Sequence, residues 1–538
     1  MSRNLTLRRA WPYLAVAAMV GARLASDLAW LSRTDYPFTA DFLAWADQYA
    51  RALRESGIFG VIRRALGESY YPPLLFALWG CVGAAFDDPR AAAPVVSAIF
   101  HLGGLCALVS LVRAETERAA PALVASALIL LAPQFAFWSR TPLLEIPMAA
   151  LIPVIVWGAV RSERFTRHVP AAVAGVSAGL GLLIKWTFVT AIAGIALAWM
   201  ADAALAAIRD KSGSRFAWRG LAAAIVAVIV VAAPWYIFGL DFGEIRSHAQ
   251  TDPTTATPLE VLWWYPARLA TQAWGFVPTI LCVLAGPFAF ALPRRRAAWI
   301  AAAGLAVAFA SLVVIPHKNI RYAAVLIPYL ALLAALGMGA LQRIGKTAGA
   351  IGLAAGVAVA TICAATLWTR SFARDLFPSA TGDLERIRAA CLGDHKTVMD
   401  RVLARLDPRA DAPASIALHP LAKNTMSFGY DLIFHALAMN GKARLIGFEI
   451  PGYEEFSNRF AEADLLIVPA SVWSTSDEDL RGVMIDIVNT LRPGSSPTPV
   501  PDDPLFRVRI DRAYALTETV ETACAGPIEI YAKKATGP

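Results

Sequence analysis

The sequence predicts a polytopic α-helical membrane protein with about eleven transmembrane helices, followed by a C-terminal soluble α/β domain. The 538 residues are 57% hydrophobic and only 17% charged, whereas soluble domains average about 45–50% apolar and about 25% charged residues. Residues 1–374 carry 32 Lys and Arg against 18 Asp and Glu, a net charge of +14, and residues 375–538 carry 17 against 23, a net charge of −6. Only the first part has apolar runs near the roughly 20 residues that a bilayer requires. We therefore expect a transmembrane domain at 1–374 and a soluble domain at 375–538.

The eleven expected spans are apolar runs, uncertain by about two to four residues at each end. They lie at 11–31, 91–112, 119–138, 146–160, 169–184, 187–208, 220–239, 272–292, 297–316, 322–341 and 347–368. Lys185 divides the fifth run from the sixth, which predicts a tight hairpin. A further run at 72–86 is short and lies between Pro-containing segments. We expect it to form an interfacial or re-entrant helix, because it is too short to span.

The cations between these runs predict the orientation. With the N-terminus in the cytoplasm, the inner loops carry seventeen Lys and Arg, and every short inner loop satisfies the positive-inside rule. Eleven spans then place the C-terminal domain outside the cytoplasm, on the periplasmic or extracytoplasmic side of the cell inner (cytoplasmic) membrane. The first outer loop, 32–90, has helical periodicity from Phe38 to Tyr49 and aromatic residues typical of the interface. We expect interfacial helices there.

The C-terminal part alternates strand and helix signals. Strands are expected at 415–418, 444–448, 465–468, 506–510 and 528–531, and helices at 426–440 and 474–491. This order predicts a small α/β sandwich. Cys391 and Cys524 are the two cysteines of this domain, and they are either paired in a disulfide or two unrelated thiols. No basic stripe indicates a nucleic-acid-binding surface.

Ionisable residues at span ends are the candidates for chemistry, because such groups are expensive near the bilayer. The expected topology places all of them on the outer side: Asp41, Glu145, Lys185, and the cluster His317, Lys318, Arg321 and Tyr322. Two carboxylates facing several cations can bind a phosphorylated donor and remove a proton from an acceptor. Alternatively, Lys318 and Arg321 extend to lipid headgroups.

Other patterns carry no comparable signal. Arg23 and Asp27 have the i,i+4 spacing of a structural ion pair within the first span. The chain has no HExxH, CxxC or P-loop motif. We therefore expect no metal site and no cofactor.

Five short motifs follow one another along residues 1–370. They are Asp41 with Ser56-Gly57, then Tyr71-Pro72-Pro73-Leu74, then Ser139-Arg140 with Glu145, then Gly179-Leu180-Gly181-Leu182-Leu183-Ile184-Lys185, and last Lys318-Asn319-Ile320-Arg321-Tyr322 before Pro328. In this order they resemble the polytopic GT-C glycosyltransferases, in the group of the protein O-mannosyltransferases and aminoarabinose transferases (glycosyltransferase family 39/83-like). The chain departs from that pattern at Asp41-Phe42, where Asp-Glu is usual, and at Glu145, where Asp is common.

The resemblance implies a GT-C fold and a reaction. A sugar linked through phosphate to a polyprenyl lipid is transferred, with inversion in a single displacement, to a hydroxyl group of a lipid, glycan or protein acceptor. Asp41 is implied as general base, and Glu145 as a catalytic residue that orients the acceptor or sugar or helps to hold Asp41. The implied donor-binding residues are Tyr71, Arg140, Lys185, His317, Lys318, Arg321 and Tyr322. The alternatives are a flippase or transporter, or a ligase or polymerase, of lipid-linked glycans.

Overall fold

The computed structural model describes most of the first 368 residues and the strands of the C-terminal part. The described residues are 2–31, 40–68, 71–86, 89–132, 138–140, 143–209, 217–240, 258–315, 320–368, 398, 401–402, 404–405, 414–418, 443–446, 464–469, 514–521 and 528–534. The chain divides into two compact units. The first comprises Met1–Ser32, Gln48–Ile245 and Thr254–Ala380, and the second comprises Arg33–Asp47, Arg246–Pro253 and Thr381–Pro538.

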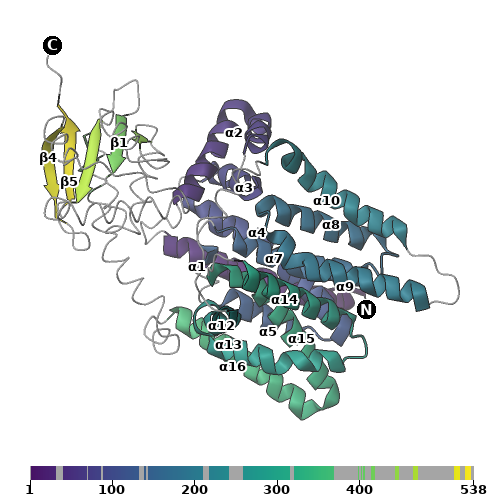
Figure 1. Ribbon diagram of the computed structural model, residues 1–538. Helices are drawn as coiled ribbons and strands as arrows, with labels where there is room; N and C mark the ends of the chain where they lie inside the picture. Colours follow the sequence, from purple (N-terminus) through teal and green to yellow (C-terminus); the bar gives the residue numbers. More distant parts are fainter. Residues whose placement is uncertain are drawn as a thin grey trace. The chain divides into compact units, whose positions relative to one another are not determined.

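The first unit is a bundle of helices (Figure 1). Its main helices are α1 (Ser2–Leu31), α4 (Ala92–Thr116), α5 (Ala120–Leu130), α7 (Glu145–Arg161), α8 (His168–Ile184), α9 (Phe188–Arg209), α10 (Trp218–Phe238), α14 (Arg296–Val314), α15 (Ile327–Ile344) and α16 (Lys346–Trp368). Between them lie shorter elements: α3 (Leu74–Gly83), η1 (Pro89–Ala91), α12 (Pro258–Arg268), the π-helical η2 (Leu269–Ala273), α13 (Phe276–Ala285), and the 3₁₀-helices η3 (Gly286–Ala291) and η4 (Ile320–Leu326). Helix α2 (Ala40–Leu66) is interrupted at Gly57, whose φ of 61° is a left-handed conformation that glycine adopts without a steric penalty.

Every predicted span contains a helix in the described part of the chain. Six of these helices are long and apolar enough to cross a membrane, and a seventh is obtained if Leu262–Thr271 and Phe276–Ala291, bent by 115°, form one span. The other predicted runs are helical as well, although α5, α7 and α8 have only 11, 17 and 17 residues. The chain is therefore a multi-pass membrane protein, and the number of eleven spans stays a prediction. Helix α3 has ten residues, which give a length of about 15 Å, half of the bilayer core.

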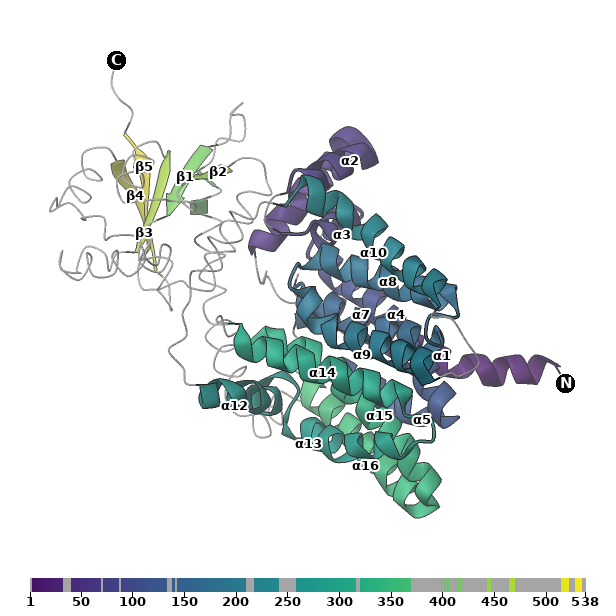
Figure 2. The same ribbon diagram turned by 45° about the vertical axis from the view of Figure 1, so that its right-hand side comes forward.

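Small residues allow the helices to pack closely. Helix α8 lies between α7 and α10, α9 packs against α14, and α15 is the most buried of the candidate spans (Figure 2). A Cβ atom added at Gly175 of α8 would overlap the backbone of Ala224 in α10, and one at Gly194 of α9 would overlap that of Ala303 in α14. Such contacts are typical of helix pairs in membranes, where small side chains let backbones approach.

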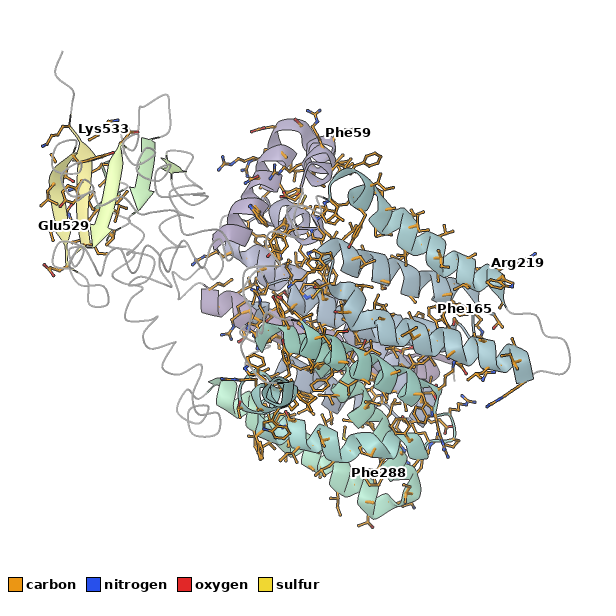
Figure 3. The ribbon with its side chains drawn as sticks, in the orientation of Figure 1. Phe59, Phe165, Arg219, Phe288, Glu529 and Lys533 are labelled. Carbon is orange, nitrogen blue, oxygen red and sulfur yellow. The ribbon has the colours of Figure 1, made fainter. Side chains whose placement is uncertain are left out.

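The loop between α7 and α8 is fixed against the start of α10. Phe165 stacks on Trp199 of α9 with ring centroids 4.2 Å apart, and the Phe165 carbonyl lies where a side chain at Gly220 would be. Figure 3 shows Phe165 and Arg219 at the same end of the bundle. In the expected topology this is the cytoplasmic end.

The second unit contains a five-stranded sheet of order β2-β1-β3-β5-β4. Strand β1 (Ala414–Leu418) pairs in parallel with β2 (Ala443–Ile446) and β3 (Leu465–Pro469), and β5 (Ile528–Lys533) pairs antiparallel with β3 and β4 (Tyr514–Val520). Four of these strands were expected. Strand β4 was not, because the polar residues Thr517, Glu518 and Thr519 follow one another in its sequence; only Tyr514 and Val520 are buried. The expected strand at 506–510, the helices at 426–440 and 474–491, and Cys391 and Cys524 lie outside the described residues.

Candidate active site

Glu145 is the first residue of α7 and is only 2% exposed. Pro147 lies in the first turn of this helix, where an N–H group has no intrahelical partner and proline is therefore tolerated. The first turn of a helix also favours a negative charge, because the unpaired N–H groups there carry partial positive charge. The sequence thus places the carboxylate at the start of the helix and buries it.

Lys185 follows directly after α8 and has an extended backbone, with φ −156° and ψ 129°. Its N–H still donates to the Gly181 carbonyl at 3.0 Å, and its own carbonyl accepts from the N–H of Phe188 at 2.9 Å. A Cβ at Gly181 would overlap the Phe188 ring. Glycine at 181 therefore allows α8 and α9 to form the predicted tight hairpin, with Lys185 at its turn.

Arg321 and Tyr322 lie in η4, between α14 and α15. The Lys185 ammonium is 4.5 Å from the centroid of the Tyr322 ring, and the Arg321 guanidinium carbon is 5.7 Å from the same centroid. Both distances are within the range of cation–π attraction. The Tyr322 ring thus brings together cations from two separate loops.

The three charged groups meet at one oxygen atom. Lys185 Nζ is 2.9 Å from Glu145 Oε1, and Arg321 Nε is 3.4 Å from the same oxygen. The Lys185 side chain is 11% exposed and that of Arg321 is 26% exposed. Residues 145, 185 and 321 come from three different loops of the chain, so the fold assembles this cluster.

The charges in this cluster do not cancel. One carboxylate faces two cations, which leaves a net charge of +1. The second oxygen, Glu145 Oε2, is buried and has no hydrogen-bond partner among the described residues. A buried acceptor without a partner costs free energy. The site is therefore suited to an anion beside the cations and a hydroxyl donor beside Glu145.

Tyr71 lies just before α3 and close to this cluster. Its ring packs edge-on against Phe76 at 6.0 Å, and its hydroxyl is within electrostatic range of Arg321. The structure therefore brings together four of the predicted site residues with Tyr71: Glu145, Lys185, Arg321 and Tyr322.

Arg140 is held elsewhere. Its Nε lies 2.8 Å from Asp27 Oδ1, and the same carboxylate is contacted by Arg23 of the preceding helical turn. From the sequence, Arg140 is expected to bind the donor, and Arg23 and Asp27 are expected to pair within one helix. The structure joins the three residues in one network.

Glu68 was not singled out from the sequence. It is 8% exposed, pairs with Arg64 at 3.1 Å, and its carbonyl accepts a hydrogen bond from Trp235 Nε1 at 2.9 Å. Burial, with Glu68 nearby, raises the pKa of the Tyr49 hydroxyl. The available signal was an acid three residues before Tyr71 and four residues after Arg64.

The remaining predicted residues cannot be placed against the cluster. The backbone of Asp41 lies in α2, but its side chain is outside the described part, as are His317 and Lys318. Among the described residues, no group of three or more His, Cys, Asp or Glu could hold a metal ion.

Comparison with known proteins identifies the type of protein that has this fold. Residues 83–245 match the family model described as dolichyl-phosphate-mannose-protein mannosyltransferase. The structure of ArnT from Cupriavidus metallidurans bound to undecaprenyl phosphate superposes with a TM-score of 0.60 at 13% identity, covering 99% of each chain. The apo form of the same ArnT gives 0.59 at 14% identity, covering 97% of this chain and 98% of that chain. No curated protein matches the chain in sequence. The chain thus has the fold of this ArnT, and its residues 83–245 are similar to the dolichyl-phosphate-mannose-protein mannosyltransferase family.

Proposed function

We propose that this GT-C protein transfers a sugar from a polyprenyl-phosphate donor to a hydroxyl group of a lipid, glycan or protein acceptor. The observation that carries the proposal is the buried cluster of Glu145, Lys185 and Arg321, with its net charge of +1. A sugar linked through a phosphodiester carries one negative charge, so donor and site neutralise each other. The similar ArnT has been observed with undecaprenyl phosphate, which has the same chemistry as the leaving group.

The cations act on the leaving group. When the bond between the anomeric carbon and the phosphate oxygen breaks, its electron pair stays on that oxygen and the phosphate gains negative charge. Lys185 and Arg321, with Lys318 and His317 from the same loop, stabilise that charge. Fixed cations in a site of low dielectric stabilise developing charge more strongly than water does.

The carboxylates act on the attacking hydroxyl. Asp41 takes the proton while the acceptor oxygen attacks the anomeric carbon on the face opposite the phosphate, which inverts that centre. Glu145 Oε2, which lacks a partner among the described residues, accepts a hydrogen bond from a hydroxyl of the sugar or acceptor. Tyr71 and Tyr322 hydrogen-bond the phosphate or stack on the sugar.

The expected topology places this site at the outer face of the cytoplasmic membrane, with residues 375–538 as an extracytoplasmic domain. Helix α2 fits an interfacial position. Its residues Ile58, Phe59 and Ile62 are 58%, 77% and 48% exposed. The same helix also exposes charged residues such as Arg54 and Glu55. A helix that exposes large apolar side chains beside charged ones is suited to the lipid interface.

The proposal is tested with the purified chain in lipid nanodiscs. It is incubated with a panel of polyprenyl-phosphate sugars, and mass spectrometry detects released polyprenyl phosphate and the glycosylated acceptor. Asp41→Asn should lower turnover about 10²–10⁴-fold, the usual contribution of a positioned base. Asp47→Asn, on the same helix, is the control and should retain activity.

Other outcomes identify the alternatives. Movement of the intact donor across the bilayer, without release of polyprenyl phosphate, would indicate a flippase. Joining of two lipid-linked glycans would indicate a ligase or polymerase. Unchanged turnover of Asp41→Asn would refute the assignment of the base.

A further inference from the structure

A second buried carboxylate, Asp27 of α1, organises a network beside the segment that leads to Glu145. Asp27 is 2% exposed. Arg23 contacts both of its oxygens, with Nη2 2.7 Å from Oδ1 and Nε 2.9 Å from Oδ2. Arg140 Nε lies 2.8 Å from Oδ1, and the Ser139 hydroxyl donates to Oδ2 at 3.2 Å. We call these four residues the Asp27 network.

The network joins parts of the chain that are far apart in sequence. Ser139 also accepts a hydrogen bond from Arg23 Nη2 at 3.2 Å, and Arg23 Nη1 lies 3.5 Å from the Leu130 carbonyl at the end of α5. The first helix of the chain thus holds both the end of α5 and the residues 139 and 140.

The position of Glu145 depends on that connection. Arg140 precedes Glu145 by five residues, so their Cα atoms are separated by at most about 17 Å. Leu143 and Leu144 between them are buried, at 5% and 1% exposure. Displacement of Arg140 would therefore be transmitted to the start of α7.

The composition of the network indicates positioning more than stabilisation. Burying three charges is costly, and well-packed apolar residues often stabilise a fold equally well. What a carboxylate with four directional contacts supplies is one defined geometry. Misplacement of a reacting group by about 1 Å can lower a rate about 10²-fold.

We propose that Asp27 is a positioning residue for sugar transfer. Through Ser139 and Arg140 it fixes the segment leading to Glu145, and thereby sets the Glu145 carboxylate against Lys185 and Arg321. The inference rests on the proposed function for its kinetic consequence. It also assigns Arg140 to this framework, and not to the donor.

The chain contains a matched control. Asp202 of α9 likewise pairs with two arginines, 3.2 Å from Arg164 Nε and 2.6 Å from Arg296 Nε. Its position is fourteen residues after Phe188, about 21 Å along α9 from the end of the helix near Lys185. The Asp202 side chain is 27% exposed, and Arg296 also donates to the carbonyls of Ala159 and Val160 in α7, fourteen and fifteen residues after Glu145. Loss of this carboxylate therefore perturbs an ion cluster with two arginines at the far end of α7, away from residues 139–145.

The experiment measures the melting temperature, kcat and KM of Asp27→Asn and Asp202→Asn in nanodiscs. Both substitutions should lower the melting temperature. Only Asp27→Asn should lower kcat, about 10- to 100-fold, with KM for the donor changed less than about threefold, since the loss is confined to the transition state. In a Glu145→Gln background, Asp27→Asn should lower kcat no further, because both changes remove the same contribution. If Asp27→Asn fails to fold, Ser139→Ala replaces it, because this substitution leaves no charge unpaired. Ser139→Ala should lower kcat by a smaller factor, and it too should lower kcat no further in the Glu145→Gln background.

Three results would overturn the inference. The first is an equal loss of kcat in Asp27→Asn and Asp202→Asn, and the second is kcat losses that multiply in the Glu145→Gln background. The third is a raised KM with unchanged kcat in Asp27→Asn, which would indicate that Arg140 binds the donor. If the wild-type chain transfers no sugar, the proposed function fails and a structure of Asp27→Asn decides the inference. The inference then requires that the 2.9 Å contact between Glu145 and Lys185 be lost, and an intact contact would refute it.

Discussion

Glu145 determines the net charge of the cluster that it forms with Lys185 and Arg321. Its one negative charge lies between Lys185 and Arg321 and leaves an excess of one positive charge. Without the carboxylate, the two cations would repel each other, and an anionic ligand would be their counter-ion. In the proposed function, Glu145 therefore affects fold stability, donor affinity and turnover together.

Glu145→Gln should lower turnover and lower the free energy of unfolding by about 3–5 kcal/mol, because it leaves the buried Lys185 ammonium without its carboxylate. Added polyprenyl phosphate should raise the melting temperature of this variant more than that of the wild type, since binding to the folded state stabilises it. Differential scanning fluorimetry with and without the lipid measures both effects.

Glu117→Gln is the control. The Glu117 carboxylate lies 3.5 Å from Arg343, and its side chain is 86% exposed. Such exposed pairs contribute about 0–1 kcal/mol. A lipid-induced shift of equal size in wild type, Glu145→Gln and Glu117→Gln would show that the phosphate does not bind beside Glu145.

For single residues, the sequence indicates which ionisable side chains are energetically costly near the bilayer. It does not indicate which residues they contact. Glu145, Lys185, Arg321 and Tyr322 stand out as polar groups at span ends, and the fold brings them together. Arg140 stands out equally but contacts Asp27. The difference depends on how α1 packs beside residues 138–140, and no local pattern encodes a contact over more than a hundred residues.

The hairpin of α8 and α9 is the element that positions Lys185. Its turn is short because Gly181 leaves room for the Phe188 ring. The motif from Gly179 to Lys185 therefore has a physical meaning: its small residues serve the packing, and its lysine serves the site. Helix packing and placement of the cation are coupled in this element.

Gly181→Ala should destabilise the chain by about 1–3 kcal/mol, because overpacking forces side chains and backbone to shift. It should also weaken binding of polyprenyl phosphate, since Lys185 moves with the hairpin. Thermal unfolding and lipid titration measure the two effects.

Gly103→Ala in α4 is the matched control, because nothing lies within 4 Å of the added Cβ. That variant should keep its affinity and gain up to about 1 kcal/mol, the advantage of alanine over glycine in a helix. Unchanged affinity in Gly181→Ala would separate the hairpin from the site.

Helices were more predictable than the irregular segments between them. Long apolar runs identify α4, α9, α10, α14, α15 and α16 because the bilayer requires length and hydropathy together. The sharp bend between α12 and α13 was not predicted. It arises at the π-helical η2 and at Gly275, whose φ is 98°. A single glycine within an apolar run is a weak sequence signal for a bend.

On the scale of the whole molecule, charge separates the chain into two parts. The net charge is +14 over residues 1–374 and −6 over residues 375–538, which gives the overall +8. The positive charge is therefore not one basic surface of the kind that binds nucleic acid. Most of the excess cations lie in the loops expected on the inner side, which follows the positive-inside rule. Of the 32 Lys and Arg in residues 1–374, seventeen are expected in the inner loops, and Lys185 and Arg321 are among the other fifteen.

This distribution predicts how single cysteines will react in a cysteine-free background. In intact spheroplasts, a membrane-impermeant maleimide should label Ala515→Cys in the exposed part of β4. It should label Arg295→Cys, in the exposed loop before α14, only after lysis. The reverse pattern would invert the topology and move the proposed site to the cytoplasmic face.

The central claim is that Lys185 and Arg321, which Glu145 holds together, bind the phosphate of a polyprenyl-linked sugar, and a structure of the chain with bound polyprenyl phosphate tests it most directly. The account predicts phosphate density within hydrogen-bonding distance of Lys185 Nζ and the Arg321 guanidinium, with the lipid chain leading into the bilayer. Phosphate density at Arg164 and Arg296 around Asp202, with none beside Lys185, would contradict it.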